Sequence, residues 1–199
     1  KIDTRQPIYF KSSARNVFTL NEVFNTSAAS GGKLFFEDCL NEFNLNEMKV
    51  WIRHYNAENN PVTSKPWDRT YLKNNGLDGD VWILGMKTEA IALHALTTNG
   101  ARTEILGGFF RDHRGIAEGE GMDITQAPPY FVTENASISA SYFSNSDGGT
   151  RPVEARETRK GSTKELKLNS GTNNVMVTLY SGFTDGMQGS ANRRIQSEF

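Results

Sequence analysis

Apolar residues along this chain occur mostly in short runs of about five to nine residues that are rich in Val, Ile, Trp, Phe and Thr. Residues of these types pack well on the pleated surface of a β-strand. Clusters of Gly, Asn, Asp and Pro separate the runs, and such clusters are typical of turns. Three of these clusters are NAENNP (56–61), KNNGLDGD (73–80) and TTNGA (97–101). The pattern predicts an all-β chain.

Helical periodicity is scarce, and one stretch fits it loosely. In LFFEDCLNEFNLNEMK (34–49) the apolar residues include Leu34, Cys39 and Phe43, whose spacings approach those of one helical face. This stretch is the best candidate for an amphipathic helix in the chain.

Short apolar phrases recur along the sequence. The tripeptide Ile-Leu-Gly occurs at 83–85 and 105–107, Val-Trp-Ile occurs at 50–52 and 81–83, and ILGGFF (105–110) is echoed by ISASYF (138–143) and TLYSGF (178–183). The spacings vary between about 20 and 40 residues, which is too uneven for the blades of a propeller. They fit a repeat in which equivalent strands stack and loops of varying length leave the turns.

The repeats predict a single-stranded right-handed parallel β-helix, a solenoid of about six rungs with long irregular loops. One short strand cannot bury its apolar face alone, and stacking the next strand about 4.8 Å away places like side chains over like. Ile83 is then expected beside Ile105, and Leu84 beside Leu106. Each rung is expected to hold three short strands, with Gly85 and its counterpart in the next rung at the bend where a strand ends.

The same interpretation divides the chain into three parts. Residues 1–30 are predicted to form an irregular N-terminal segment that covers part of the helix. Residues 31–184 are predicted to form the parallel β-helix, and residues 185–199 a polar C-terminal tail.

A family resemblance rests on GDVWILGMKTEAIALHALTTNGARTEILGGFF (79–110) and PPYFVTENASISASYF (128–143). These segments resemble rungs of the secreted pectate-lyase superfamily of parallel β-helix proteins. The resemblance covers about a third of the chain and implies an extracellular protein that interacts with polysaccharide. It implies no particular reaction, because that superfamily contains lyases, hydrolases, tailspikes and non-catalytic scaffolds.

Composition and charge exclude several classes. The formal net charge of −1 argues against a nucleic-acid partner, because such proteins usually carry a basic excess. No stretch approaches the run of about 20 apolar residues that a membrane span needs. The single cysteine, Cys39, allows no internal disulfide and is expected to be a buried, inert thiol. Two glycosylation sequons, at Asn25 and Asn135, matter only in a eukaryotic secretory route.

The densest charged cluster is FFRDHRG (109–115), directly after the second Ile-Leu-Gly strand. Strand ends often carry functional residues. Arg111 or His113 is a candidate catalytic base or substrate clamp, and Asp112 is a candidate acid. The alternative is a solvated polar turn.

Trp51 and Trp82 are the candidate carbohydrate-binding aromatics. If the neighbouring isoleucines point inward, strand alternation turns both indoles outward, one stacked beside the other. Arg53 and Lys87 are expected near them, and together with His54 and Arg111 they would form a basic strip suited to an anionic polysaccharide. The alternative is that a loop or the N-terminal segment covers the two indoles as a second small core.

No cofactor is expected, and no protein metal site is assigned. The turn NNGLDGD (74–80) offers Asp78 and Asp80 as oxygen ligands for Ca²⁺, although turns favour the same residue types. His94 alternates with apolar neighbours and is expected to be structural. The sequence contains no nucleotide-binding, zinc-protease or serine-hydrolase motif.

Two hypotheses for function remain open. The favoured one is a non-catalytic extracellular scaffold, adhesin or filament subunit that binds polysaccharide or copies of itself. Its open strand edges would support a homo-oligomer or a head-to-tail filament. The alternative is a polysaccharide lyase or glycoside hydrolase of the pectate-lyase-like superfamily.

Overall fold

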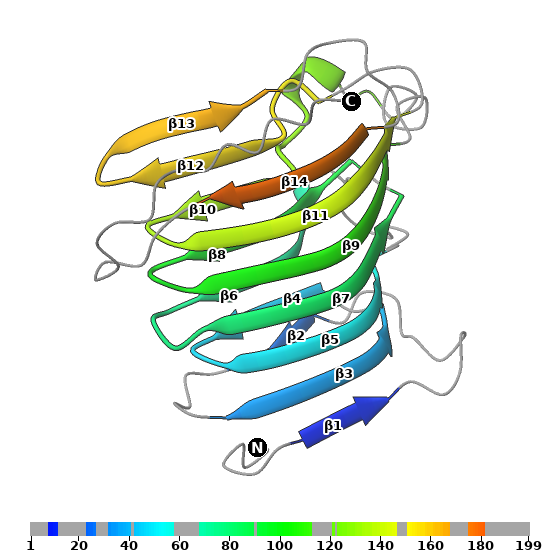
Figure 1. Cartoon of the computed structure of the whole chain (residues 1–199), viewed down its shortest axis with the longest axis vertical. Coiled ribbons are helices and arrows are strands. Elements are labelled where there is room, and N and C mark those ends of the chain that lie inside the picture. The colour runs from blue at the N-terminus through cyan, green and yellow to red at the C-terminus, as the bar shows by residue number, and fades with distance from the viewer. Residues whose placement is uncertain are drawn as a thin grey trace.

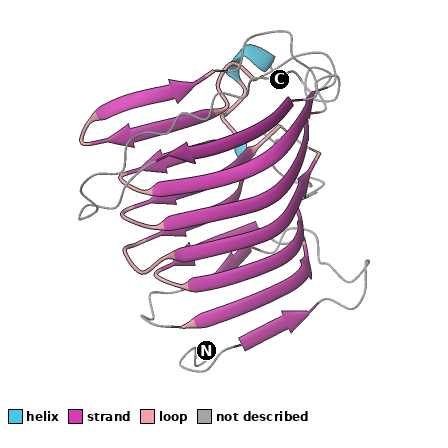
Figure 2. Cartoon of the chain, viewed as in Figure 1, coloured by secondary structure: helices cyan, strands magenta, loops and turns pink. Residues whose placement is uncertain are grey.

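The structure is a computed structural model of the 199-residue chain. It describes residues 8–11, 23–26, 32–40, 42–57, 68–89, 91–112, 121, 123–146, 151–167 and 175–181. Strands dominate these ranges, and the 3₁₀ turn η2 (Ile124–Gln126) is a short exception (Figure 2). The predicted all-β class is therefore confirmed.

The strands form two seven-stranded sheets, which we call sheet A and sheet B. Sheet A contains, in spatial order, β1 (Ile8–Lys11), β3 (Lys33–Cys39), β5 (Lys49–Asn56), β7 (Asp80–Thr88), β9 (Arg102–Asp112), β11 (Ser137–Ser146) and β14 (Val175–Ser181). Sheet B contains β13 (Ser162–Leu166), β12 (Ala155–Arg159), β10 (Phe131–Glu134), β8 (Leu93–Thr98), β6 (Thr70–Asn75), β4 (Glu42–Asn46) and β2 (Val23–Asn25).

The chain alternates between the two sheets from β1 to β12, and each pass adds one parallel strand to a growing stack (Figure 1). The parallel order ends at the C-terminal side of the stack. There β14 pairs antiparallel with β11 in sheet A, and β13 pairs antiparallel with β12 in sheet B. Both sheets are therefore mixed.

The predicted single-stranded right-handed β-helix with three strands per rung is wrong. The finding that overturns it is the pair of mixed sheets, to which each repeat contributes one long strand in sheet A and one shorter strand in sheet B. The error came from Gly85 and Gly107, which were expected to end a strand. Both residues have positive φ, of 77° and 74°, yet β7 and β9 continue through them. One bent strand was therefore counted as two.

The bends form a column across sheet A. Asp38 in β3 and His54 in β5 have φ of 55° and 56°, and they occupy the same place in their strands as Gly85 and Gly107. The strand registers skip each of these residues: Glu37 pairs with Arg53, and the next pair is Cys39 with Tyr55. An extra left-handed residue at one place in neighbouring strands bends the sheet there.

The stretch considered as a helix forms strands β3 and β4 instead. Buried and more exposed residues alternate along β4, and Phe43 and Leu45 point inward. This is the two-residue period of a strand. The helical spacing was incidental, because the stretch is divided between two strands: β3 ends at Cys39 and β4 begins at Glu42.

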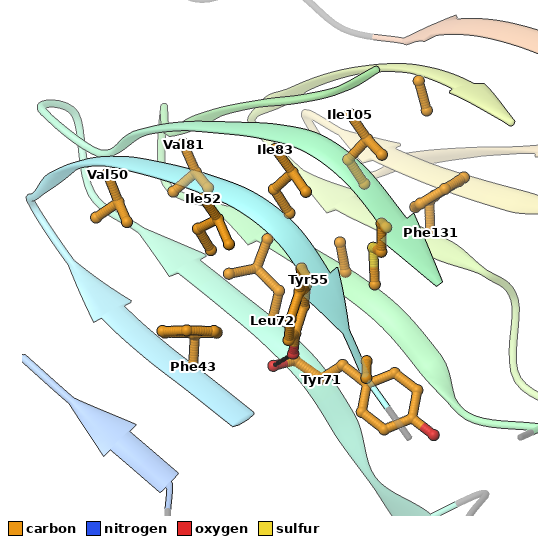
Figure 3. Close-up of a cluster of buried hydrophobic side chains, with 14 of the residues drawn as sticks. Phe43, Val50, Ile52, Tyr55, Tyr71, Leu72, Val81, Ile83, Ile105 and Phe131 are labelled. Atoms are coloured by element: carbon orange, nitrogen blue, oxygen red, sulfur yellow. Dashed lines mark hydrogen bonds between the residues drawn. The ribbon is translucent and has the colours of Figure 1, made fainter. Parts of the chain in front are cut away.

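The hydrophobic core lies between the two sheets (Figure 3). Val50, Ile52, Val81, Ile83 and Ile105 point into it from sheet A, and Phe43, Tyr71, Leu72 and Phe131 from sheet B. The predicted neighbours are confirmed, since Ile83 pairs with Ile105 and Leu84 with Leu106. Ring contacts join the sheets, as between Phe36 and Phe43, whose centroids lie 4.9 Å apart.

The predicted N-terminal segment, residues 1–30, supplies β1 and β2, one strand to each sheet. The rest of that segment lies outside the described ranges, except for Thr26, and so do residues 185–199.

Candidate functional site

Three aromatic side chains form a ladder on the outer face of sheet A. The rings of Phe35 and Trp51 stack with centroids 4.7 Å apart at 9°, and those of Trp51 and Trp82 stack at 4.8 Å and 12°. The three residues are half-buried. The predicted stacking of Trp51 on Trp82 is confirmed, and Phe35 extends it by one strand.

The strand register explains the ladder. Phe35 pairs with Trp51 and Trp51 with Trp82 in a parallel arrangement. The following residues, Ile52 and Ile83, are buried in the core. Because successive side chains of a strand point to opposite faces, the preceding aromatics must point away from the core.

The stacking leaves little of each ring face for a ligand. Both faces of the Trp51 indole are covered, one by Phe35 and the other by Trp82. The residue that pairs with Trp82 on its other side is Glu104 of β9, which carries no ring. Trp82 therefore ends the ladder among the described residues, and one of its indole faces is turned toward Glu104.

A second column of side chains runs beside the ladder. It consists of Glu37, Arg53, Leu84 and Leu106, which are in register on β3, β5, β7 and β9. Leu84 is 57% and Leu106 46% exposed. Large apolar side chains that are exposed together often mark a binding surface.

A groove of about 480 Å³ lies along the two columns. We call it the sheet A groove; it is lined by Phe35, Phe36, Glu37, Trp51, Ile52, Arg53, Trp82, Ile83, Leu84, Glu104 and Leu106. It crosses four strands, so it is about 14 Å long at the usual strand spacing. A mainly apolar concavity with a few polar groups is the usual form of a ligand site.

Of the described residues that line the groove, three are charged: Glu37, Arg53 and Glu104. The Arg53 guanidinium forms an ion pair with the buried Glu37 carboxylate of the adjacent strand. Glu104 is half-buried, and no hydrogen bond or ion pair joins it to another described residue. The groove thus carries one paired and one unpaired carboxylate.

The predicted basic strip does not form. Arg53 is in register with Leu84, whereas Lys87 is in register with Asn56 and Phe109, beyond the bend. Lys87 also forms an ion pair with Glu89, with 2.7 Å between Nζ and Oε1. His54 lies 3.1 Å from the Asp38 carboxylate. Neighbouring carboxylates thus offset these basic side chains.

Asp112, the candidate acid, lies in the interior with 1% of its surface exposed. The Arg151 guanidinium donates to both of its carboxylate oxygens, at 2.9 and 2.8 Å, and the Tyr130 hydroxyl donates at 2.8 Å. Arg151 also donates to the carbonyls of Ala92 and Pro128, both at 2.6 Å. This geometry joins several chain segments and leaves Asp112 no open position for a substrate.

The other two candidate catalytic residues do not complete a site. Arg111 is half-buried at the end of β9, one residue before Asp112 and therefore on the opposite side of the strand. His113 lies outside the described ranges. The described residues therefore do not assemble the predicted catalytic group.

His94 is buried among the rings of Tyr71, Phe110 and Tyr130, and its Nε2 lies 2.8 Å from the Thr88 hydroxyl. Burial, with a contribution from the nearby Arg151 charge, holds the His94 pKa well below its usual value. The ring therefore stays neutral in the folded protein, as expected of a structural histidine.

Glu154 and Arg151 are buried charged residues that the sequence did not single out. Burial raises the pKa of Glu154 to about 7, although the Tyr142 hydroxyl donates to its carboxylate at 2.8 Å. Neither residue falls in a repeat or a motif, so no sequence signal identified them.

The two candidate calcium ligands, Asp78 and Asp80, lie in different surroundings. The Asp80 carboxylate is buried and accepts two hydrogen bonds from Arg102, at 2.5 and 2.8 Å. Asp78 is exposed in the turn before it. Within the described ranges no three His, Cys, Asp or Glu side chains are grouped as metal ligands.

The single cysteine and the two glycosylation sequons are the remaining candidates from the sequence. Cys39 is buried, and burial raises the pKa of its thiol to about 12, so it fits the expected inert thiol. The sequon residue Asn25 lies in β2, and Asn135 lies in the turn between β10 and β11. Both side chains are exposed.

Comparisons with known proteins provide no relative: no family model, no curated protein and no solved structure matches the chain. In the parts of the chain that the structure describes, no helix is long and apolar enough to cross a membrane.

Proposed function

We propose that this chain is a non-catalytic extracellular protein that binds polysaccharide in the sheet A groove. The observation that supports the proposal is the groove itself, where an aromatic ladder and two exposed leucines lie beside carboxylate and guanidinium groups. Extracellular location and polysaccharide as ligand come from the resemblance to secreted pectate-lyase-superfamily proteins.

The chemistry of the groove suits a sugar chain that lies across the strands. The C–H faces of sugar rings are apolar and can pack against Leu84, Leu106 and the ring of Trp82. The sugar hydroxyls can exchange hydrogen bonds with Arg53, Glu37 and Glu104 at the groove walls. Such a combination of apolar contact and few polar groups fixes the orientation of a ligand.

The test is affinity electrophoresis of the protein through gels that contain single polysaccharides. The double variant Leu84→Asn/Leu106→Asn removes the exposed leucines of the groove and is expected to weaken retardation about tenfold, because it removes apolar contact area. Leu77→Asn is the matched control, since Leu77 is 76% exposed in a turn outside the groove. Equal retardation of all three proteins would contradict the proposal.

The alternative function is polysaccharide cleavage by a lyase or hydrolase. It requires catalytic groups that reach the substrate, and the buried ion pair of Asp112 with Arg151 argues against Asp112 as one of them. Incubation with neutral and anionic polysaccharides is expected to release no new reducing ends and no unsaturated uronates. Release of either product would contradict a non-catalytic role.

Self-association is a second candidate, because sheet A carries a third exposed apolar residue besides Leu84 and Leu106. This residue is Phe109, which is 37% exposed and whose ring stacks on that of Phe143 with centroids 5.8 Å apart. A homo-oligomer or head-to-tail filament would appear as a sedimentation coefficient that rises with concentration. If Leu84→Asn/Leu106→Asn abolishes that rise, the same face serves self-association.

A further inference from the structure

We propose that the end of the ladder, where Trp82 faces Glu104, is a binding subsite for an uncharged sugar unit, so that the polysaccharide is a neutral one. This inference rests on the proposed function and names the ligand class of the same groove. We call this place the Trp82–Glu104 subsite.

The first support is the position of Trp82 in the ladder. A sugar ring stacks on the flat face of an aromatic ring, and the faces within the ladder are occupied by other rings. Trp82 differs because its neighbour on β9 is Glu104 rather than an aromatic residue. Among the described residues, no other ring stacks on the indole face of Trp82 that is turned toward Glu104.

The second support is the state of Glu104. Its carboxylate borders the same groove, is half-buried, and makes no hydrogen bond or ion pair to another described residue. A carboxylate accepts through both oxygens and can bind two neighbouring hydroxyls of one sugar ring. Trp82 and Glu104 thus supply the apolar platform and the polar anchor that one sugar unit needs.

The third support is the charge of the groove. Among the described residues, its lining contains the carboxylates of Glu37 and Glu104 and the guanidinium of Arg53, and Arg53 is already paired with Glu37. A uronate unit on Trp82 would place its carboxylate beside Glu104 in a partly desolvated site. Like charges at such short range repel, and a neutral hexose avoids the repulsion.

The two leucines complete the argument. Leu84 and Leu106 follow Trp82 and Glu104 at two residues' distance on β7 and β9, so they lie on the same outer face. They form an apolar wall opposite the ladder and offer no charge to an acidic sugar. The subsite therefore favours a sugar unit that is apolar on its ring face and carries hydroxyls at its edge.

The test measures retardation in gels that contain neutral polysaccharides (β-glucan, galactomannan) or anionic ones (polygalacturonate, alginate). The wild type is expected to bind a neutral polymer at least about tenfold more tightly than either anionic polymer. Trp82→Leu and Glu104→Gln are each expected to weaken neutral binding about tenfold. Leu77→Asn is the control, because Leu77 is exposed in a turn outside the groove, and its effect is expected to stay below about twofold.

Glu104→Arg provides a gain of function, since it places a cation at the subsite and is expected to create binding to polygalacturonate. Circular dichroism of each variant confirms that it is folded. Tighter wild-type binding to an anionic polymer would overturn the inference and leave the proposed function standing. Equal losses in Trp82→Leu and Leu77→Asn would also overturn it. If the wild type binds no polysaccharide, the proposed function fails and the inference fails with it.

Discussion

At the residue scale, charged side chains of this protein serve two different purposes according to their burial. In the sheet A groove Arg53 is exposed, and the half-buried Glu104 has no partner among the described residues. At the end of β9 the charges are enclosed, where Arg151, which lies between β11 and β12, binds Asp112 and stacks over the Tyr130 ring at 3.9 Å. The first group suits a ligand, and the second stabilises the fold.

The buried pair predicts a large stability effect for Asp112→Asn. The substitution leaves the Arg151 charge enclosed without its counter-ion, which typically costs about 3–5 kcal/mol. Urea denaturation of the variant should show this loss. Asp38→Asn is the control, because Asp38 is an exposed carboxylate beside His54, and its cost should stay below about 1 kcal/mol. Similar costs for the two variants would contradict a structural role for Asp112.

Glu154 predicts a pH dependence of stability. Its pKa is about 7 in the folded protein against 4.5 ordinarily, so between these values the folded protein keeps a proton that the unfolded chain has released. Rising pH therefore lowers stability across this window, by up to about 3 kcal/mol. The stability of the wild type minus that of Glu154→Gln should fall between pH 4.5 and 8.

The stability of the wild type must be compared with that of Glu154→Gln, because His94 changes the pH dependence of stability in the opposite direction. Its lowered pKa makes stability rise with pH up to about 6.5, where the unfolded histidine loses its proton. Glu154→Gln retains His94, so subtraction removes that effect. A difference that is constant with pH would show that the carboxyl of Glu154 is not held protonated.

Some residue-scale features could be predicted from sequence and others could not. The outward stacking of Trp51 and Trp82 follows from strand alternation and the repeated Val-Trp-Ile phrase. The pairing of Asp112 with Arg151 could not be predicted, because the two residues are far apart in sequence and Arg151 belongs to no repeat. The basic strip failed because it ignored neighbouring carboxylates such as Glu37.

At the element scale, the strands of sheet A share one bend, made by Asp38, His54, Gly85 and Gly107 in successive strands. Asparagine side chains link turns on the sheet B side, as where Asn75 donates to Asn46 at 2.6 Å and Asn99 donates to Asn75 at 2.7 Å. Repeated bends and turns hold the strands in register. The outer columns of the groove stay aligned as a consequence.

Two adjacent glycines of β9 predict different costs of substitution. A Cβ on Gly108 would lie 2.7 Å from both Phe110 Cζ and Tyr142 Cβ, so Gly108→Ala should cost about 1–3 kcal/mol through overpacking. Gly107 has a φ of 74° and nothing within 4 Å of an added Cβ. Because Asn tolerates this conformation, Gly107→Asn should cost less than about 1 kcal/mol. Urea denaturation compares the two, and the opposite order would contradict the observed register.

The strand pairing was predictable where apolar phrases repeat, as for Ile83 with Ile105. The number of strands per repeat was not, because a left-handed glycine occurs both at strand ends and in bends within a strand. The echo of ILGGFF in ISASYF illustrates the limit. Phe109 does pair with Phe143, but Ile105 pairs with Ala140 rather than with Ile138, and the extra residue Gly107 accounts for one of these two positions.

At the scale of the whole molecule, two mixed sheets enclose one core, and the outer face of sheet A carries the groove. The alternation of the chain between sheets gives sheet A a regular array of like residues in adjacent strands. Such an array suits a long repeating ligand, which can contact several strands in the same way. The fold thus supports the proposal of a polysaccharide ligand on this face.

The measurement that tests this account most directly is an NMR titration of the tryptophan indole N–H signals with a neutral polysaccharide fragment that the protein binds. Tryptophan-to-phenylalanine variants assign the signals of Trp51 and Trp82. We predict that the Trp82 signal shifts most as the ligand saturates the protein, because no other described ring stacks on its indole face toward Glu104. Saturation confirmed by calorimetry with no change at Trp82 would place the ligand elsewhere and contradict the account.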